Sequence, residues 1–390
     1  MEERLNILNF TQSDSIVKVI GVGGGGGHAV GKLYNESPDN ISFLVCNTDT
    51  QDLKSSPVPF QLPLGREITH GNGCGADPEK GRLAAEECRQ EIYDLLNDGT
   101  RMVFITAGMG GGTGTGASPV IAKIARDELH ILTIGIVTLP FLFEYGKRYG
   151  RALEGIKALK ECVDSLVIIS NELLFDTNPD MSLENAFSSV DAVVSNAARS
   201  IAEIVTVPGN INIDFADVNT IMNNSGVAIM NIGYSKSGME HRLEEALRDA
   251  LNTPLLQNKK IEGANRVLLN IYTSKEHPLS MPEVDYINEF LQTLEIDQDC
   301  DVIWGYSTLD GLEESLKVTL IITGFEVEEI PEFREEYARL TKTRRQAKTP
   351  ATPQEPGKIA TFTESEMNDD VEQIDFSFDT GNIDLPPSKR

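Results

Sequence analysis

The chain has 390 residues and a formal charge of −26, because 60 aspartates and glutamates outnumber 34 lysines and arginines. This charge disfavours a protein that wraps nucleic acid or lies on an anionic membrane, since phosphates and acidic lipids repel it. With 40% hydrophobic and 6% aromatic residues the composition is that of a globular protein, and the length fits one large or two medium domains.

The cysteines and the hydropathy pattern indicate a reducing, aqueous compartment. Cys46, Cys74, Cys88, Cys162 and Cys300 are odd in number and lack CxxC or Cys/His spacing, which argues against a disulfide framework and against a zinc site. No apolar run approaches the roughly 18 to 20 residues that a membrane-spanning helix needs. We therefore expect a cytoplasmic protein that does not insert into a membrane.

Short apolar runs in the first part of the chain predict a parallel β-sheet. They begin at Ile16, Ile41, Met102, Ile131 and Ser165, and stretches that can hold helices separate them. Continuous apolar runs of this length are typical of strands that are buried on both faces. We predict a doubly wound α/β domain over residues 16–181, after a flexible N-terminus at residues 1–15.

A long amphipathic helix is expected next, over residues 182–209. Its apolar residues recur at steps of three and four, at Leu183, Phe187, Val190, Val194, Ala197, Ile201 and Ile204. Residues 210–325 hold more widely spaced strand-like runs and two helical stretches, which indicates a smaller α+β domain. Beyond them lies a segment with few aliphatic residues, which cannot bury enough apolar surface to offset the entropy of ordering it, so we predict a disordered linker over residues 326–381.

The first strand runs directly into a glycine-rich segment, Gly21 to Ala29. Glycines at a strand-to-helix turn let the backbone approach a phosphate, and the helix N-terminus supplies N–H groups and a partial positive charge. Gly21, Gly23 and Gly26 also match GxGxxG, and Asp49 ends the second strand where a dinucleotide fold has its ribose-binding acid. Taken alone, this loop predicts a binding site for NAD. The plainer alternative is a glycine turn that is needed only for packing.

A second glycine loop, Gly108 to Gly116, follows the third strand and opens another helix. Two such loops at the carboxyl ends of strands in one sheet converge on one crevice, which suits a run of phosphates. The threonines of the loop add hydroxyl donors. Neither loop contains GxxxxGKS/T, so the phosphate charge must be met by N–H groups, helix dipoles and Mg²⁺ bound through the phosphates.

The segment GGGTGTG, from Gly110 to Gly116, resembles the signature of the tubulin superfamily. The phrases KVIGVGGGGGHAV, NTDTQDL, GADPEKGRLAAEE, FITAGMGGGTGTGASPVIA, LPFLFEYGKR and NIDFADVNTIMNNSG resemble, in the same order, those of the FtsZ family of bacterial cell-division GTPases. The resemblance implies a tubulin/FtsZ-like fold. It also implies a GTPase that polymerises head to tail into the protofilaments of the division ring at mid-cell.

The resemblance further implies which residues bind GTP or GDP. Gly24, Gly25, Gly26, Gly27, Gly112, Thr113 and Gly114 would hold the α and β phosphates, Gly75 and Ala76 would lie near the γ phosphate, Glu144 and Arg148 would contact ribose and phosphates, Asn171 and Asp191 would hydrogen-bond the guanine, and Phe187 would stack on it. Plainer alternatives exist: an i,i+4 ion pair for Glu144 and Arg148, a core position for Phe187, and a solvent-facing Asp191.

Two residues depart from the family pattern at this site. His28 stands where the family usually has asparagine, and Cys74 stands where a small residue is common. His28 adds a donor whose strength varies with pH. The departures leave nucleotide affinity, rather than nucleotide binding, open.

Hydrolysis requires a group that orients or activates water, and the candidates are Asn212, Asp214 and Asp217. Asp214 and Asp217 are equally well placed to cap the next helix. The preceding helix is about 37 Å long, which keeps these acids away from the nucleotide of their own subunit. The resemblance implies that they act in trans on the adjacent subunit, where Asp214 and Asp217 would position the attacking water, Asn212 would shape the loop, and Mg²⁺ would offset developing charge.

The resemblance finally implies a C-terminal peptide, residues 382–390, that docks on membrane tethers and regulators of the division ring. Asp384-Leu-Pro followed by Lys389 and Arg390 is a partial match, because the expected aromatic or aliphatic pair after the proline is missing. The acidic run before it, with Ile374 and two phenylalanines, is another candidate docking segment. An end without a function is the remaining alternative.

Two other functions stay open on the residues alone. An NAD(P)-dependent oxidoreductase explains GxGxxG and Asp49 but leaves GGGTGTG and NIDFADV without a role. A GTP-binding structural protein that polymerises but hydrolyses poorly is the second, and the intact acidic loop argues against it.

Overall fold

The structure, a computed structural model, describes residues 15–36, 40–144, 147–172, 181–235, 241–251, 264–293 and 300–325. The chain divides into two units, Met1–Thr341 and Lys342–Arg390, and every described residue belongs to the first. Nearly all of the predicted N-terminal segment 1–15, the linker 326–381 and the peptide 382–390 lie outside the described residues.

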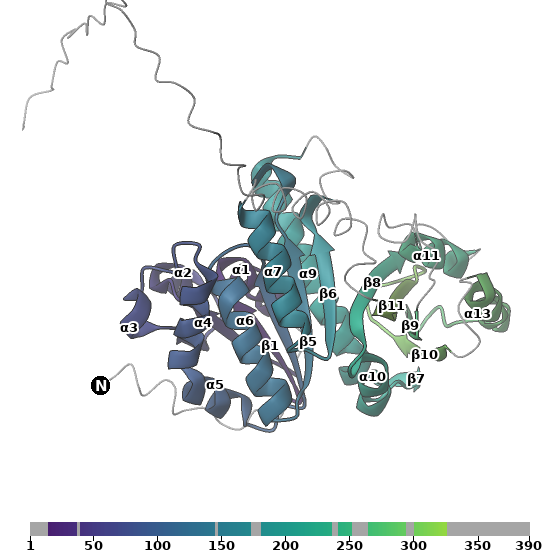
Figure 1. Cartoon of the computed structure of the whole chain (residues 1–390). Coiled ribbons are helices and arrows are strands. Elements are labelled where there is room, and N and C mark those ends of the chain that lie inside the picture. The colour runs from purple at the N-terminus through teal and green to yellow at the C-terminus, as the bar shows by residue number, and fades with distance from the viewer. Residues whose placement is uncertain are drawn as a thin grey trace, which may run out of the picture. The chain divides into compact units, whose positions relative to one another are not determined.

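The described strands form one sheet of eleven strands (Figure 1). They are β1 (Val17–Val22), β2 (Ile41–Asn47), β3 (Gln61–Pro63), β4 (Met102–Gly108), β5 (Leu132–Leu139), β6 (Ser165–Ser170), β7 (Gly209–Ile211), β8 (Gly226–Tyr234), β9 (Arg266–Thr273), β10 (Asp301–Thr308) and β11 (Lys317–Phe325). Their order across the sheet is β3-β2-β1-β4-β5-β6-β8-β11-β9-β10-β7. Neighbours from β3 to β8 are parallel, and β11 is antiparallel to both β8 and β9.

Helices supply the crossovers that parallel strands require. They are α1 (Gly23–Asn35), α2 (Thr50–Ser55), α3 (Arg66–Thr69), α4 (Pro78–Glu87), α5 (Arg89–Leu96), α6 (Thr113–Lys123), α7 (Lys147–Lys160), α9 (Leu183–Thr206), α10 (Phe215–Met222), α11 (Arg242–Leu251) and α13 (Met281–Thr293). A π-helical turn, Ile124–Glu128, extends α6, and a 3₁₀ turn, Leu142–Glu144, precedes α7.

Alternate residues of the central strand β4 face two different cores. Phe104 packs in a cluster with apolar residues of α1, α9 and α10, whereas Val103 and Ile105 pack in a cluster with residues of α4, α5, α6 and α7. Because helices cover both faces of the sheet around β4 (Figure 1), this strand buries every residue from Met102 to Ala107. This is why the strands appear in the sequence as continuous apolar runs.

The long helix α9 has an apolar stripe that divides into two parts. It begins after the N-cap Ser182, whose side chain accepts a hydrogen bond from the Asn185 amide. The stripe is buried from Val190 onward, but Leu183 and Phe187 in the first turns are 58% and 42% exposed. Leu183 and Phe187 therefore lie outside the core and stay accessible, whereas Ala186 between them packs against Phe141.

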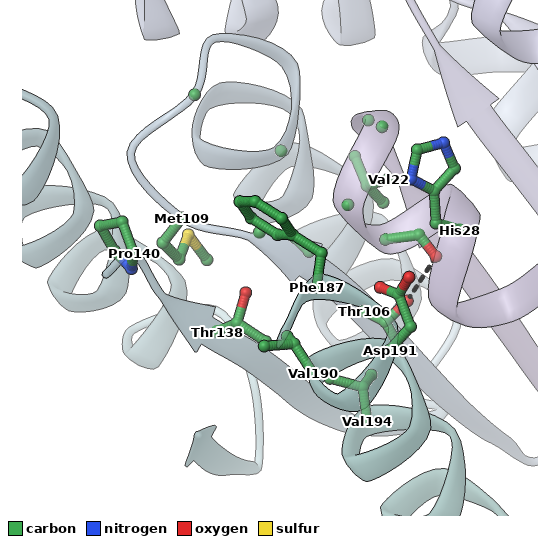
Figure 2. A pocket seen from close by; sticks show the side chains of 18 of the residues that line it. Val22, His28, Thr106, Met109, Thr138, Pro140, Phe187, Val190, Asp191 and Val194 are labelled. Carbon is green, nitrogen blue, oxygen red and sulfur yellow. Dashed lines mark hydrogen bonds between the residues drawn. The ribbon is translucent and has the colours of Figure 1, made fainter. Parts of the chain in front are cut away.

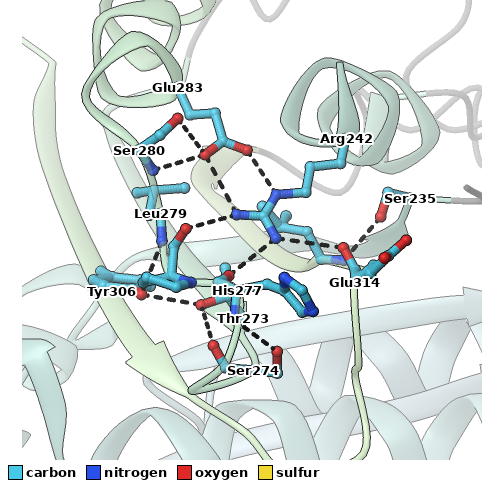
Figure 3. Close-up of polar contacts among 12 residues, drawn as sticks. Ser235, Arg242, Thr273, Ser274, His277, Leu279, Ser280, Glu283, Tyr306 and Glu314 are labelled. Atoms are coloured by element: carbon cyan, nitrogen blue, oxygen red, sulfur yellow. Dashed lines mark hydrogen bonds and ion pairs between the residues drawn. The ribbon is translucent and has the colours of Figure 1, made fainter. Parts of the chain in front are cut away.

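A fully buried arginine, Arg242, ties together the loops around α11 (Figure 3). Its Nε and Nη2 atoms donate to the Glu283 carboxylate at 2.7 and 3.4 Å. The guanidinium also donates to the carbonyls of His277, Pro278 and Glu314 at 2.9 to 3.3 Å. One side chain thus replaces the water that these groups lose on folding.

Arg242→Ala is expected to lower the free energy of unfolding by about 3–5 kcal/mol, because it strands a half-buried carboxylate and three carbonyls. Urea denaturation measures the loss. Arg248→Ala is the matched control, since Arg248 is exposed and forms an i,i+4 ion pair with Glu244 at 2.6 Å, and its removal costs less than about 0.5 kcal/mol. Equal losses in the two variants would contradict a special role for the buried pair.

The contribution of the Arg242–Glu283 pair to the free energy of unfolding depends on pH, and the direction of this dependence follows from the pKa of Glu283. Burial raises the pKa of Glu283, but hydrogen bonds from Arg242 and Ser280 outweigh it, and the net pKa lies below its ordinary value. A carboxyl with a lowered folded-state pKa contributes stability above the ordinary pKa and loses it as the pH falls through the lowered value. The stability difference between wild type and Glu283→Gln should therefore shrink on acidification.

Candidate functional site

A cavity of about 610 Å³ opens at the carboxyl ends of β1, β4 and β5, where α1 and α6 begin (Figure 2). Its wall consists of Val22, Gly23, Gly24, Gly25, Gly26, His28, Thr106, Ala107, Gly108, Met109, Gly111, Gly112, Thr113, Gly114, Thr138, Pro140, Glu144, Arg148, Asn171, Glu184, Phe187, Val190, Asp191 and Val194. The carboxyl edge of a parallel sheet is the usual place for ligands in doubly wound folds. Both predicted glycine loops meet in this one cavity.

Backbone contact explains why the two loops consist of glycine. A Cβ on Gly26 would lie 2.2 Å from the Thr106 carbonyl oxygen, so α1 can touch β4 only without a side chain there. Gly23 has a φ of +72°, and its Cβ would lie 2.9 Å from the Gly114 nitrogen of the other loop. The N-termini of α1 and α6 are thereby brought together, and neither helix has an acidic residue in its first turn. This arrangement attracts an anion such as a polyphosphate.

An aromatic ring forms one end of the cavity. Phe187 lies edge-on to Phe141, with ring centroids 5.4 Å apart and planes at 89°. Phe141 is itself buried against Ala186 and Val190. The expectation of a possible core position for Phe187 is wrong, because its ring is half-exposed and held at the cavity wall by its core neighbour. A planar base can stack on such a ring.

Two polar side chains near this ring lack full hydrogen bonding. Asn171 is buried, and its Oδ1 atom has no hydrogen-bond partner among the described residues. A buried acceptor without a donor costs free energy unless a ligand supplies one. Burial raises the pKa of the Asp191 carboxyl, and the nearby charges of His28 and Lys32 oppose this shift. Asn171 and Asp191 are acceptors that fit the N–H edge of guanine.

The plainer alternative for Glu144 and Arg148 is present, and it does not exclude contact with a ligand. Their side chains form an i,i+4 ion pair at 2.7 Å, and the Glu144 carboxylate also accepts a hydrogen bond from the Phe141 amide at 3.0 Å. Both residues line the cavity. Arg148 is 49% exposed, so its guanidinium can turn toward a phosphate at little cost.

The two residues that depart from the family pattern occupy different positions. His28 lines the cavity, and its Nε2 atom lies 3.3 Å from the Asp52 carboxylate. Asp52 also accepts a hydrogen bond from Asn47 at 2.7 Å. Cys74 is instead buried behind the loops, with its Sγ atom 3.3 Å from the Thr48 hydroxyl. His28 can therefore touch a ligand directly, whereas Cys74 acts through packing.

Some wall residues were missed on the sequence alone. Thr106 and Thr138 are at the ends of their strands, and Glu184 and Val194 are on the same side of α9 as Phe187 and Asp191. The two threonines could have been predicted, because residues near the carboxyl ends of parallel strands often line a ligand site. The side of α9 that faces the cavity could not have been predicted, because its apolar residues have the same spacing as the core stripe.

Three of the predicted phosphate-binding residues do not line the cavity. Gly27 is buried, and a Cβ there would meet the Val45 side chain at 3.2 Å. Gly75 and Ala76 form a turn beside the second glycine loop, since a Cβ on Gly112 would lie 2.5 Å from that of Cys74. These residues are neighbours of the wall rather than part of it.

The acidic residues lie at the opposite end of α9, whose 24 residues extend about 36 Å. Asp214 caps α10 and accepts hydrogen bonds from the amides of Ala216 and Asp217 at 2.7 and 3.1 Å. Asp217 closes the capping box by accepting the Asp214 amide at 2.9 Å, and the Asn212 side chain accepts the Gly209 amide at 3.1 Å. Helix capping, the plainer alternative, is therefore present.

The described residues show neither a metal-binding cluster nor a membrane-spanning helix. No group of three or more His, Cys, Asp or Glu side chains is arranged to hold a metal ion. No described helix is long and apolar enough to cross a membrane.

Comparison with known proteins decides the family. The tubulin/FtsZ family GTPase domain matches residues 16–179, and the FtsZ family C-terminal domain matches residues 226–326. The cell division protein FtsZ of Porphyromonas gingivalis is 49% identical over 333 residues, which are 84% of this chain and 71% of that protein. The chain belongs to the tubulin/FtsZ family.

Other members of the family agree with this assignment. The cell division protein FtsZ of Coxiella burnetii is 45% identical over 309 residues, 79% of this chain and 78% of that one. An FtsZ dimer from M. jannaschii has a TM-score of 0.73 at 38% identity, covering 83% of this chain and 91% of that chain. A protofilament of CetZ2 from Haloferax volcanii has a TM-score of 0.72 at 20% identity, covering 85% and 99%, and shows the same fold.

The family assignment settles several predictions. The FtsZ-family fold class and the GTPase activity predicted from the sequence are confirmed. A GTPase domain gives both glycine loops a purpose, which the oxidoreductase alternative does not. The cavity described above suits a guanine nucleotide through its two glycine loops, its aromatic ring and the Asn171 acceptor that has no partner among the described residues.

Asn171→Ala is expected to reduce the preference for GDP over ADP about tenfold, because it removes a buried acceptor that matches the N1–H and N2–H₂ donors of guanine but not the bare N1 acceptor of adenine. Competition against a fluorescent GDP analogue measures both affinities. Asn171→Asp keeps the acceptor and is the matched control. An unchanged ratio of GDP to ADP affinity in Asn171→Ala would show that Asn171 does not read the base.

Proposed function

We propose that this family member polymerises head to tail into protofilaments of the division ring, and that two subunits share each GTPase site. The separation of the two halves of the site carries the proposal. The nucleotide-sized cavity lies at one end of α9 and the acidic pair at the other, about 36 Å away. Stacking brings the acids of one subunit onto the nucleotide of the next, a heterologous contact that extends into a filament. The M. jannaschii relative is described as an FtsZ dimer.

In this proposal the nucleotide lies across the two glycine loops. Gly24 to Gly26 and Gly112 to Gly114, all in the cavity wall, hold the α and β phosphates through backbone N–H groups and helix N-termini. Glu144 and Arg148 contact ribose and phosphates, while His28 adds a donor at the rim. Phe187 stacks on guanine, and Asn171 and Asp191 accept hydrogen bonds from it. Backbone N–H donors let a protein with a charge of −26 bind an anion at loops that contain no lysine or arginine.

Capping and catalysis by the acidic pair are compatible. The capping box uses Oδ1 of Asp214 and Oδ2 of Asp217. Within the described chain, the second oxygen of each carboxylate makes no hydrogen bond, and the Asp214 side chain is exposed. The cap therefore fixes both acids and leaves one oxygen of each to orient a water molecule of the adjacent site.

We also propose that Mg²⁺ binds at the site mainly through the phosphates of the nucleotide. The ion usually keeps several waters and is held by substrate phosphates, so the phosphates would supply its principal ligands here. The hydroxyl of Thr113 lies in the cavity wall, 2.6 Å from the Thr48 hydroxyl, and is an oxygen ligand that the second loop would offer to the ion. When bound, the ion supplies positive charge for the transferred phosphoryl group.

The location and partners of the polymer also belong to the proposal. The division proteins of P. gingivalis and C. burnetii are relatives over most of this chain, which supports assembly at the mid-cell division ring. We assign residues 382–390 to docking on membrane tethers and regulators, with residues 326–381 as the linker. Pull-down of division-ring membrane proteins by the isolated peptide, compared with a scrambled peptide, tests that assignment.

Asp214→Asn separates catalysis from capping, because asparagine caps a helix about as well as aspartate but carries no charge. We expect GTP turnover to fall at least about 100-fold, with unchanged thermal stability and longer-lived polymers by light scattering. Asp94→Asn, elsewhere on the surface, is the control. Turnover near the wild-type value in Asp214→Asn would remove the acid from the mechanism.

Complementation tests whether the site is shared. Asp217→Ala and Asn171→Ala damage different halves of the site, so a mixture forms some contacts in which both halves are intact. We expect the mixture to hydrolyse GTP faster than either variant alone, and wild-type turnover per subunit to rise above a critical concentration. Turnover in the mixture equal to the mean of the two variants would indicate a site within one subunit.

A further inference from the structure

A strained turn lies beside the second glycine loop. The backbone of Gly75 and Ala76 has φ values of 58° and 60°, and the Asp77 amide donates to the Cys74 carbonyl at 3.1 Å. Two successive left-handed residues inside a four-residue turn are the pattern of a type I′ turn. Glycine adopts this conformation freely, but alanine does so only at a cost in free energy. Other contacts must therefore hold Ala76 in place.

This turn borders the wall of the cavity. A Cβ on Gly112 would lie 2.5 Å from the Cβ of Cys74 and 3.0 Å from the Asp77 nitrogen. The amides of Gly75 and Ala76 donate to no group within the described chain, and a Cβ on Gly75 would meet nothing within 4 Å. The turn thus presents two unused N–H donors beside the phosphate-binding loop, an arrangement that binds anions.

Arg151 of α7 contacts the strained residue. Its Nη1 atom donates a hydrogen bond to the Ala76 carbonyl oxygen. The Nε atom is shielded from solvent and has no hydrogen-bond partner among the described residues. A guanidinium that is partly desolvated without full pairing is a poor source of stability. Its position is better explained by what the hydrogen bond to Ala76, the one that Arg151 makes within the described chain, does for the turn.

The same helix also touches the second glycine loop. Arg148, one turn before Arg151, packs against Gly110, where a Cβ would lie 2.6 Å from the Arg148 carbonyl oxygen. Helix α7 therefore contacts the phosphate loop with one arginine and the strained turn with the next. The position of the turn relative to the second glycine loop therefore depends on α7.

We propose that Arg151 is a positioning residue for the terminal phosphate of GTP. Its bond to the Ala76 carbonyl keeps Gly75 and Ala76 left-handed, which keeps their amides available to the γ phosphate. Without it, Ala76 relaxes to an ordinary conformation and the amides turn away. The inference rests on the proposed function, because it needs a nucleotide in the cavity. It adds a residue outside the cavity wall that distinguishes a triphosphate from a diphosphate.

The test compares GTPγS with GDP at protein concentrations below the onset of light scattering. We expect Arg151→Ala to weaken GTPγS binding about tenfold while GDP binding stays unchanged. Arg151→Lys keeps a cationic donor and should retain most of the affinity. Adding Ala76→Gly to Arg151→Ala should restore part of it, since glycine adopts a positive φ without support. Arg248→Ala, in a distant exposed ion pair, is the control.

Hydrogen exchange gives an independent structural measurement. The segment from Cys74 to Asp77 should exchange faster in Arg151→Ala than in wild type, and the addition of Ala76→Gly should change this segment alone. Parallel losses of GTPγS and GDP affinity, or no loss of either, would overturn the inference while leaving the GTPase intact. A wild-type protein that binds neither nucleotide would instead overturn the proposed function.

Discussion

The contact between the two glycine loops is the constraint on which the rest of the molecule depends. Gly23 and Gly26 let α1 approach Gly114 and Thr106 at distances that exclude any Cβ. Two helix N-termini then share one cavity, and the strands that carry the loops must be neighbours in the sheet, as β1 and β4 are. The order of the parallel strands, the cavity and its preference for an anion all follow from this contact.

Most of the fold could be predicted from residue patterns because both faces of the parallel sheet are covered. Strands buried on both sides produce continuous apolar runs, and the runs that begin at Ile16, Ile41 and Met102 mark β1, β2 and β4 to within one residue. The pattern does not show that β8 joins β6 to make one sheet of both halves. That pairing depends on contacts between segments about 60 residues apart, which no local periodicity encodes.

The site was predictable to the extent that its chemistry is local. The glycine loops are contiguous motifs, so their role could be inferred from spacing and from the family resemblance. Phe187 and Leu183 have the spacing of a core stripe, and only the structure shows that their side chains are exposed while the stripe is buried from Val190 onward. Asp52 and Arg151 were not predicted, because each acts on a residue far away in the sequence, His28 and Ala76 respectively. Such pairs leave no pattern within one segment.

The length of α9 has a consequence for the two ends of a head-to-tail filament. At one end the terminal subunit presents an open cavity, and at the other it presents the acidic pair. In the proposed shared site, a nucleotide at the cavity end would have no neighbouring acid, so it would stay intact and exchange until another subunit arrives. Every interior nucleotide would have a completed site and be committed to hydrolysis. The length of one helix would then give the filament kinetic polarity and keep an unhydrolysed nucleotide at one end only.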